Sequence, residues 1–254
     1  MESHSSNGFD YILKGFSLIF EKQIRLYIII PVLINILLFI AMFFIGIHFF
    51  HELTLWINHL LPKWLHWLQW LLWILFTVLI FTLYAYTFTL FTNLIGTPFN
   101  SFLSEKVEYY LTGQSLESSS WSTVLKSIPR TIGRQLQLII YYLLRAAILL
   151  LLSFIPVIHI FATIAWFLFT AWMLTIQYID YPMDNNHISF KDLRQAIGQK
   201  KLLSLSFGIS TLLFIYVPVI NFFVMPAAVA GATAMWVKEY SEVKKFEVTS
   251  NHSK

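Results

Sequence analysis

The sequence contains no cysteine and unusually little charge. Without cysteine among its 254 residues, the chain has neither a disulfide framework nor thiolate chemistry. Charged residues make up 12% of the chain, about half the fraction typical of soluble globular proteins. The first residues, MESHSSNGFDY, lack the basic start, apolar stretch and small-residue cleavage site of a secretory signal. We therefore expect no cleaved signal peptide.

Motifs for catalysis and cofactor binding are also missing. The sequence has no GxxxxGK[ST] phosphate loop, no HExxH and no GxSxG, so we expect neither an enzyme nor a cofactor. Four histidines cluster near residues 48–66, but Glu52 is the only carboxylate among them. We interpret them as interfacial polar residues and expect no metal site. The net charge of +4 does not indicate nucleic-acid binding.

Long apolar runs dominate the sequence instead. Hydrophobic residues make up 57% of it. Four runs carry no charge: Leu26–His51, Trp64–Ser104, Ala146–Ile179 and Leu202–Val237. Each exceeds the roughly 18 residues that mark a transmembrane candidate, and none alternates as the strands of a β-barrel do. The sequence therefore predicts an all-α integral membrane protein, because helices satisfy their own backbone hydrogen bonds in lipid.

The basic residues predict the orientation. Of the 17 Lys and Arg residues, all but Lys63 precede the first run, follow the fourth, or lie in two internal segments. The positive-inside rule then places both termini and those two segments in the cytoplasm. The segment 51–63 is expected outside, so the protein is expected to cross the membrane several times.

The third and fourth runs would begin and end on the same side of the membrane. As one straight helix either would be ~50 Å long, against a hydrocarbon core of ~30 Å. Both contain a proline in a similar setting, in SFIPVIHIF (153–161) and IYVPVINFF (215–223). Because proline interrupts a helix, we predict helical hairpins that turn at Pro156 and Pro218. The sequence leaves open whether their arms cross the bilayer or penetrate it only partly.

These patterns predict one polytopic membrane domain over 1–254. It has two long transmembrane helices, at about 27–50 and 68–91, and two proline-tipped hairpins, at about 136–179 and 202–237. Soluble loops are expected at 105–135 and 184–201. Beyond residue 91, the second run continues past Pro98 as a kinked or buried extension toward Glu105.

Polar residues next to the first run form a candidate anion site. Lys22, Gln23, Ile24 and Arg25 precede it directly. Free N–H groups at a helix start attract anions, and the planar guanidinium of Arg25 suits an oxyanion. The alternative is that Lys22 and Arg25 only set the topology and meet lipid phosphates.

A second set of polar residues is a candidate permeation path or gate, because polar groups at membrane depth usually face a bundle interior or a water-filled path. Its members are Asn35, Asn93, Asn100, Glu105, Arg130, Arg134 and Arg145. Arg145 enters an apolar segment, and Glu105 and Glu108 are the nearest carboxylates in sequence that could pair with it. The alternative is that the asparagines hydrogen-bond between helices and the arginines anchor lipid.

Two stretches are distinctive: PFNSFLSEKVE (98–108) and QYIDYPMDNN (177–186). They occur in order with IIIPVLINILL (28–38), LTGQ (111–114), SIPRTIGRQ (127–135) and FVMPAAVAGATAMWV (223–237). Together these stretches resemble the CysZ sulfate permeases of bacterial inner membranes from end to end. The resemblance implies two long transmembrane helices with partly penetrating helix pairs, and a homo-oligomer built on dimers.

The resemblance also implies a function: sulfate uptake, by a channel or facilitator, that supplies cysteine biosynthesis. The expected partners are sulfate and membrane lipid. The family's site before the first long helix is similar to Gly-x-Arg-Arg. Here Arg25 matches the first arginine, while Gln23 replaces the glycine and Leu26 the second arginine. The alternative is a non-transporting membrane scaffold or assembly factor.

Overall fold

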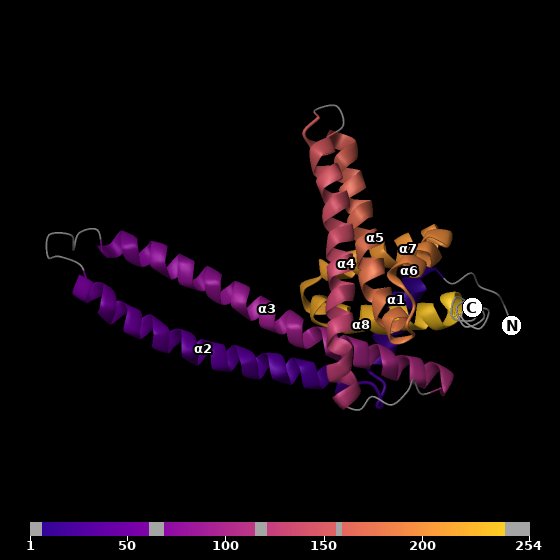
Figure 1. The fold of residues 1–254 in the computed structure, drawn as a ribbon, viewed down its shortest axis with the longest axis horizontal. Helices are drawn as coiled ribbons and strands as arrows, with labels where there is room; N and C mark the ends of the chain where they lie inside the picture. Colours follow the sequence, from indigo (N-terminus) through magenta and orange to yellow (C-terminus); the bar gives the residue numbers. More distant parts are fainter. Residues whose placement is uncertain (1–6, 61–68, 115–120, 156–158, 242–254) are drawn as a thin grey trace. The chain divides into compact units, whose positions relative to one another are not determined.

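A computed structural model describes residues 7–60, 69–114, 121–155 and 159–241, which are helical almost throughout (Figure 1). The helices are α1 (Gly8–Ile19), α2 (Leu26–Leu60), α3 (Gln69–Thr112), α4 (Trp121–Ser153), α5 (His159–Asn185), α6 (Phe190–Gln199), α7 (Lys201–Ile215) and α8 (Pro218–Met235), followed by the π-helical η2 (Trp236–Tyr240). None of these residues forms a β-strand, which confirms the predicted all-α fold.

Several helices have the length and composition of membrane spans. Within the described residues these are Leu26–Phe49, Gly133–Ser153, His159–Asn185 and Pro218–Tyr240, with shorter apolar segments at Trp73–Thr87 and Lys201–Ile215. Their surfaces are apolar as well: Leu37 and Phe44 on α2 are each 65% exposed. Because lipid is the solvent that suits such side chains, the protein is a membrane protein.

The chain divides into two compact units, which we describe separately. The unit Ile29–Phe99 contains most of α2 and the first part of α3. These two helices lie side by side (Figure 1). Their contact includes a hydrogen bond from the Tyr84 hydroxyl to the Phe39 carbonyl at 3.3 Å. It also includes Gly46, whose missing Cβ would lie 3.7 Å from the Tyr84 ring. The two helices are therefore in contact near the middle of α2.

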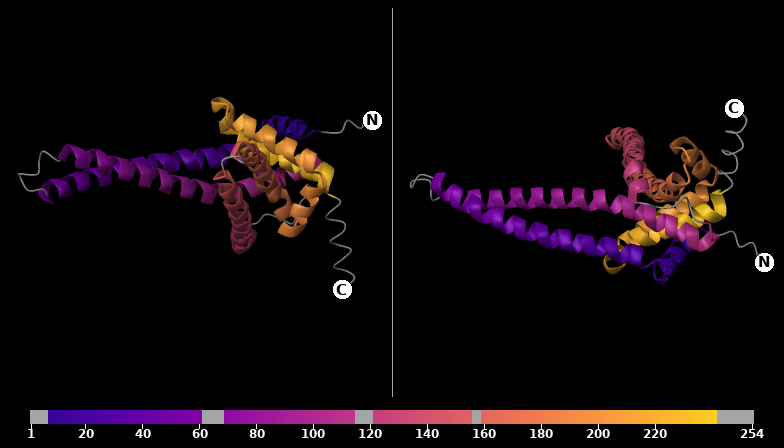
Figure 2. Two further views of the ribbon diagram at one scale, coloured as in Figure 1. Left: turned by 90° about the horizontal axis from the view of Figure 1, so that it is seen from above. Right: turned by 60° about the horizontal axis from the view of Figure 1, so that its bottom comes forward.

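The other unit combines residues 1–28 with residues 100–254. Its core lies between α1, α5, α7 and α8, and α1 packs along α8 (Figure 2). Ile12 of α1, Phe207 of α7 and Trp236 of η2 are almost completely buried there.

Glycines allow the helices of this core to touch backbone to backbone. A Cβ on Gly15 of α1 would lie 2.0 Å from the carbonyl oxygen of Ala227 on α8. A Cβ on Gly208 of α7 would lie 1.9 Å from the carbonyl oxygen of Ala171 on α5. Small residues at such crossings are typical of helix packing in membranes, where close van der Waals contact drives association.

The turn of the second hairpin is confirmed. Helix α7 ends at Ile215, two residues follow, and Pro218 opens α8. Proline suits this first helical position, because its missing N–H would have no partner there anyway. For the first hairpin, α4 and α5 pack against each other (Figure 1). Pro156 itself lies outside the described residues.

The helices extend well beyond the apolar runs. Helix α3 continues through Pro98 to Thr112, as expected for an extension of the second run. Helix α2 reaches Leu60, and α4 begins at Trp121, so both include residues for which the sequence predicts loops. The end of α3 remains helical because it is packed: Ser104 is fully buried and Glu108 is 8% exposed.

Candidate functional site

The predicted anion site forms the turn between α1 and α2. The side chain of Ile24 is completely buried and fixes the turn to the core. Lys22, Gln23 and Arg25 are exposed. The tight turn directs the one apolar side chain inward and leaves the three polar side chains accessible.

Half of the backbone donors in this turn are already used. The N–H groups of Ile24 and Arg25 both donate to the Glu21 carbonyl, at 2.9 and 3.0 Å. In the described part of the chain, the N–H groups of Lys22 and Gln23 have no backbone acceptor. An anion would therefore meet these two amides and the side chain of Arg25, and the site stays a prediction.

Gln23 fits the position at which the family that the sequence resembles has the glycine of Gly-x-Arg-Arg. Among the described non-glycine residues, only His187 has a positive φ, of 61°. Gln23 therefore occupies an ordinary backbone conformation, and its side chain causes no strain there.

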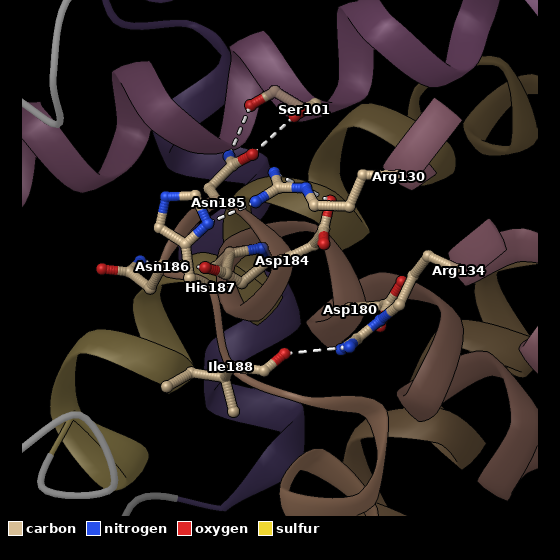
Figure 3. Close-up of polar contacts among 10 residues, drawn as sticks. Ser101, Arg130, Arg134, Asp180, Asp184, Asn185, Asn186, His187 and Ile188 are labelled. Atoms are coloured by element: carbon tan, nitrogen blue, oxygen red, sulfur yellow. Dashed lines mark hydrogen bonds and ion pairs between the residues drawn. The ribbon is translucent and has the colours of Figure 1, made fainter. Parts of the chain in front are cut away.

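Arg134 on α4 forms a buried ion pair with Asp180 on α5. Its Nε donates to Oδ1 of Asp180 at 2.7 Å, and the two side chains are 8% and 7% exposed. Its Nη1 donates to the Ile188 carbonyl at 2.9 Å (Figure 3), and its guanidinium lies 5.4 Å from the Phe190 ring centroid. Arg134 thus ties α4 to the end of α5 and to the segment after it.

Arg130, one turn earlier on α4, faces the same end of α5. Its Nη1 donates to Nδ1 of His187, and its Nη2 lies 3.4 Å from Oδ2 of Asp184 (Figure 3). The Arg130 side chain is 40% exposed. Its ion pair is therefore longer and better hydrated than that of Arg134.

The end of α5 has the geometry of a Schellman motif. The N–H of Ile188 donates to the Met183 carbonyl at 2.9 Å, and the N–H of His187 to the Asp184 carbonyl at 3.0 Å. His187 occupies the left-handed position that glycine usually takes in this motif. Ile188 and Met183, the apolar pair that accompanies it, are both buried. This cap holds His187 toward Arg130.

Polar side chains join the end of α3 to the same segment. Ser101 donates to the Asn185 side chain at 2.6 Å, and Asn185 donates back to the Ser101 carbonyl at 2.9 Å (Figure 3). Both carboxylate oxygens of Glu108 accept from Asn186, at 2.8 and 3.0 Å. Asn100, predicted to line a path, donates to the Tyr181 hydroxyl at 3.2 Å. Asn100, a predicted path residue, thus also forms a hydrogen bond between α3 and α5.

The structure brings some predicted path residues together and separates others. Arg130 and Arg134 pair with Asp184 and Asp180 rather than with Glu105 or Glu108. The pairing of Arg145 with either glutamate is wrong, because its guanidinium lies 3.5 Å from the Tyr141 ring centroid and forms no ion pair with a described residue.

Three other predicted residues contribute less to this picture. Glu105 is half-buried on α3. Asn35 and Asn93 belong to α2 and α3, but the positions of their side chains lie outside the described part.

Across the described residues, no group of three or more His, Asp or Glu side chains gathers in a way that could hold a metal ion.

The family model described as Sulfate transporter CysZ/Etoposide-induced protein 2.4 matches residues 11–226. The chain belongs to this family. The family assignment confirms the resemblance seen in the sequence, and every predicted site residue lies within the matched range.

Curated relatives in this family agree over nearly the whole chain. A Sulfate transporter CysZ of Pseudomonas fluorescens (strain Pf0-1) is 41% identical over 237 residues, covering 92% of this chain and 94% of the relative. That of strain SBW25 is 42% identical over 244 residues, covering 94% of both. That of Pseudomonas aeruginosa (strain LESB58) is 40% identical over 240 residues, covering 93% of this chain and 96% of the relative.

The acidic partners of the arginines were missed by sequence reasoning. Asp180 and Asp184 were visible only as part of the QYIDYPMDNN stretch, which carried the resemblance but no predicted role. A usable signal existed: two aspartates four apart match two arginines four apart on another helix. Side chains four apart lie on one helix face, so the two pairs could meet face to face.

Proposed function

We propose that this protein carries sulfate across the bacterial inner membrane, as a channel or facilitator that supplies cysteine biosynthesis. The observation that carries the proposal is the family match over 11–226, with relatives about 40% identical that are named as sulfate transporters. Apolar helices of spanning length support it.

The turn Lys22–Arg25 is the proposed capture site. A sulfate dianion cannot enter hydrocarbon bare, so N–H and guanidinium donors must replace its water. The exposed Arg25 offers a permanent charge and a planar fork. The amides of Lys22 and Gln23 are the backbone donors that the turn leaves available.

The proposed path or gate contains Asn35, Asn93, Asn100, Glu105, Arg130, Arg134 and Arg145. Its arginines differ in how firmly they are held. The buried Arg134–Asp180 pair is short, whereas the Arg130–Asp184 pair is longer and partly solvated. Exposed pairs contribute little to stability, so Arg130 is the one that can release its partner at small cost. We therefore assign the moving part of a gate to Arg130 and a fixed position to Arg134.

We propose a multi-pass topology with both termini in the cytoplasm and a homo-oligomer built on dimers. The distribution of Lys and Arg supports the orientation. The many exposed apolar side chains on α2 and α4 leave ample surface for lipid and for a second copy.

The alternative is a scaffold or assembly factor that does not transport. It is favoured by the internal bonds of Asn100 and Arg134, which are also those of helix packing. The discriminating experiment is uptake of radiolabelled sulfate into proteoliposomes made from this chain alone. Uptake above protein-free liposomes supports transport, and its absence in folded, correctly reconstituted protein supports the scaffold.

The capture site is tested by Arg25→Ala, for which equilibrium binding of radiolabelled sulfate is measured beside uptake. One charged hydrogen bond is worth about 1.5–3 kcal/mol, so we expect sulfate binding to weaken about ten- to a hundredfold. Arg25→Lys should retain part of the sulfate affinity that Arg25→Ala loses, and Leu26→Arg should increase the affinity of the parent protein. Lys14→Ala, at an exposed position on α1, removes the same charge as a matched control. Unchanged binding in Arg25→Ala would place the site elsewhere.

A further inference from the structure

A cationic cavity lies beside α4, and Phe190, whose ring also neighbours Arg134, is part of its lining. Its volume is about 490 Å³, and it opens to the surface between α4 and the start of α6. The polar side chains that line it are Gln137, Tyr141, Arg145, Ser189, Lys191 and Arg194. None of the lining residues is acidic.

Two arginines in this cavity share one aromatic ring. The guanidinium carbons of Arg145 and Arg194 lie 3.5 and 5.3 Å from the centroid of the Tyr141 ring. They are therefore at most about 9 Å apart, the sum of the two distances, and their like charges repel. The faces of aromatic rings attract cations, and Arg194 is also 5.3 Å from the Phe190 ring. The rings hold the two charges together without neutralising them.

The basic side chains of the cavity are not paired with carboxylates in the described part of the chain. Neither Arg145, Lys191 nor Arg194 forms an ion pair there. The nearest acidic residue in sequence, Asp192, accepts a hydrogen bond from the hydroxyl of Ser189 and keeps its charge, so three positive charges face one negative charge and the cavity stays net positive. The Nε of Arg194 is buried and has no hydrogen-bond acceptor in the described part. A cavity with one sign of charge and low-dielectric walls concentrates counter-ions.

The other side of the cavity is apolar and belongs to a span-length segment. Ile140 and Leu144 line it and are 49% and 63% exposed. Both lie in Gly133–Ser153, which is apolar enough to cross a membrane. Lys191 and Arg194 instead follow the end of the apolar segment His159–Asn185. The cavity thus joins a lipid-facing surface to a polar one, as the boundary of a bilayer does.

We propose that this cavity binds the phosphate of an anionic membrane lipid. Arg145, Lys191 and Arg194 hold the phosphate oxygens, and the acyl chain lies along the apolar side. A phosphate fits because it accepts bidentate bonds from guanidinium groups. The apolar lining identifies a lipid, rather than a free oxyanion, as its source. This site is distinct from the turn Lys22–Arg25, and it assigns Arg145 of the proposed path to lipid binding instead.

The test is lipid binding to the full-length protein in zwitterionic detergent, followed by native mass spectrometry. The probes are phosphatidylglycerol, phosphatidylcholine and glycerol 3-phosphate. We expect phosphatidylglycerol to bind at least tenfold more tightly than either of the others. Lys191→Gln and Arg194→Gln should each weaken its binding about tenfold or more, the effect of one charged hydrogen bond. Lys201→Gln removes an exposed charge from the start of α7 and should change nothing.

Several outcomes would overturn the proposal. Equal binding of phosphatidylcholine would show that charge is not recognised. Equal binding of glycerol 3-phosphate would assign the cavity to a soluble phosphate ester. Unchanged binding in Lys191→Gln, or the same loss in Lys201→Gln, would place the lipid elsewhere. Lys191 is exposed, so its replacement leaves the fold intact and decides the question even if Arg194→Gln does not fold.

Discussion

Replacing Asp180 by alanine is expected to destabilise the protein strongly. The change leaves Arg134 only 8% exposed and without its carboxylate. Its bond to the Ile188 carbonyl remains, but that group carries no charge to balance it. Removing one partner of a buried ion pair costs about 3–5 kcal/mol. At about 2–4 °C per kcal/mol for a chain of this size, Tm should fall by about 6–20 °C.

The measurement is thermal unfolding in detergent, followed by the fraction that still elutes as a single species in size-exclusion chromatography. Asp184→Ala is the matched control, because it removes the same group from the longer, more exposed pair with Arg130. Exposed pairs are worth about 0–1 kcal/mol, so the control should lose no more than about 4 °C. Equal losses in the two variants would refute the assigned roles.

A double variant separates a lost contact from a stranded charge. Because a buried ion pair can be replaced by apolar residues of similar volume at little or no cost, Arg134→Met with Asp180→Leu should recover most of the lost Tm. No recovery would show that the pair stabilises the fold by more than charge balance. Sulfate uptake by a stable double variant then reports whether Arg134 also contributes to the path.

Two further predictions concern packing and topology. Gly15→Ala places a methyl group 2.0 Å from the Ala227 carbonyl oxygen and should cost about 1–3 kcal/mol, lowering Tm in the same assay. Gly133→Ala meets nothing within 4 Å and should be neutral or up to about 1 kcal/mol stabilising. A loss in both would argue against the close α1–α8 contact. In the cysteine-free chain, Asn58→Cys should react with an impermeant thiol reagent added outside, and Gln195→Cys should not. Labelling of Gln195→Cys but not of Asn58→Cys would show that the orientation in the membrane is the opposite of the proposed one.

The sequence by itself determined the class of the protein and much of its helix order. Uncharged runs of this length indicate membrane spans, and because they do not alternate as barrel strands do, the backbone must satisfy its hydrogen bonds in lipid as helices. Pro218 marked the turn between α7 and α8 because its ring acts locally, on the preceding turn of the helix. The family could also be named from the sequence, because PFNSFLSEKVE and QYIDYPMDNN are specific stretches.

Tertiary structure decided which charges meet. Arg134 and Asp180 are 46 residues apart in the chain, and nothing local distinguishes Asp180 from Glu105 or Glu108 as a partner. The choice depends on the packing of α4 against α5 and on the cap at His187, both of which are properties of the folded unit. The same holds for the shared ring of Arg145 and Arg194. A sequence specifies that charges exist, but the energy of a charge pair depends on the distance between the two groups in space, and only the fold sets that distance.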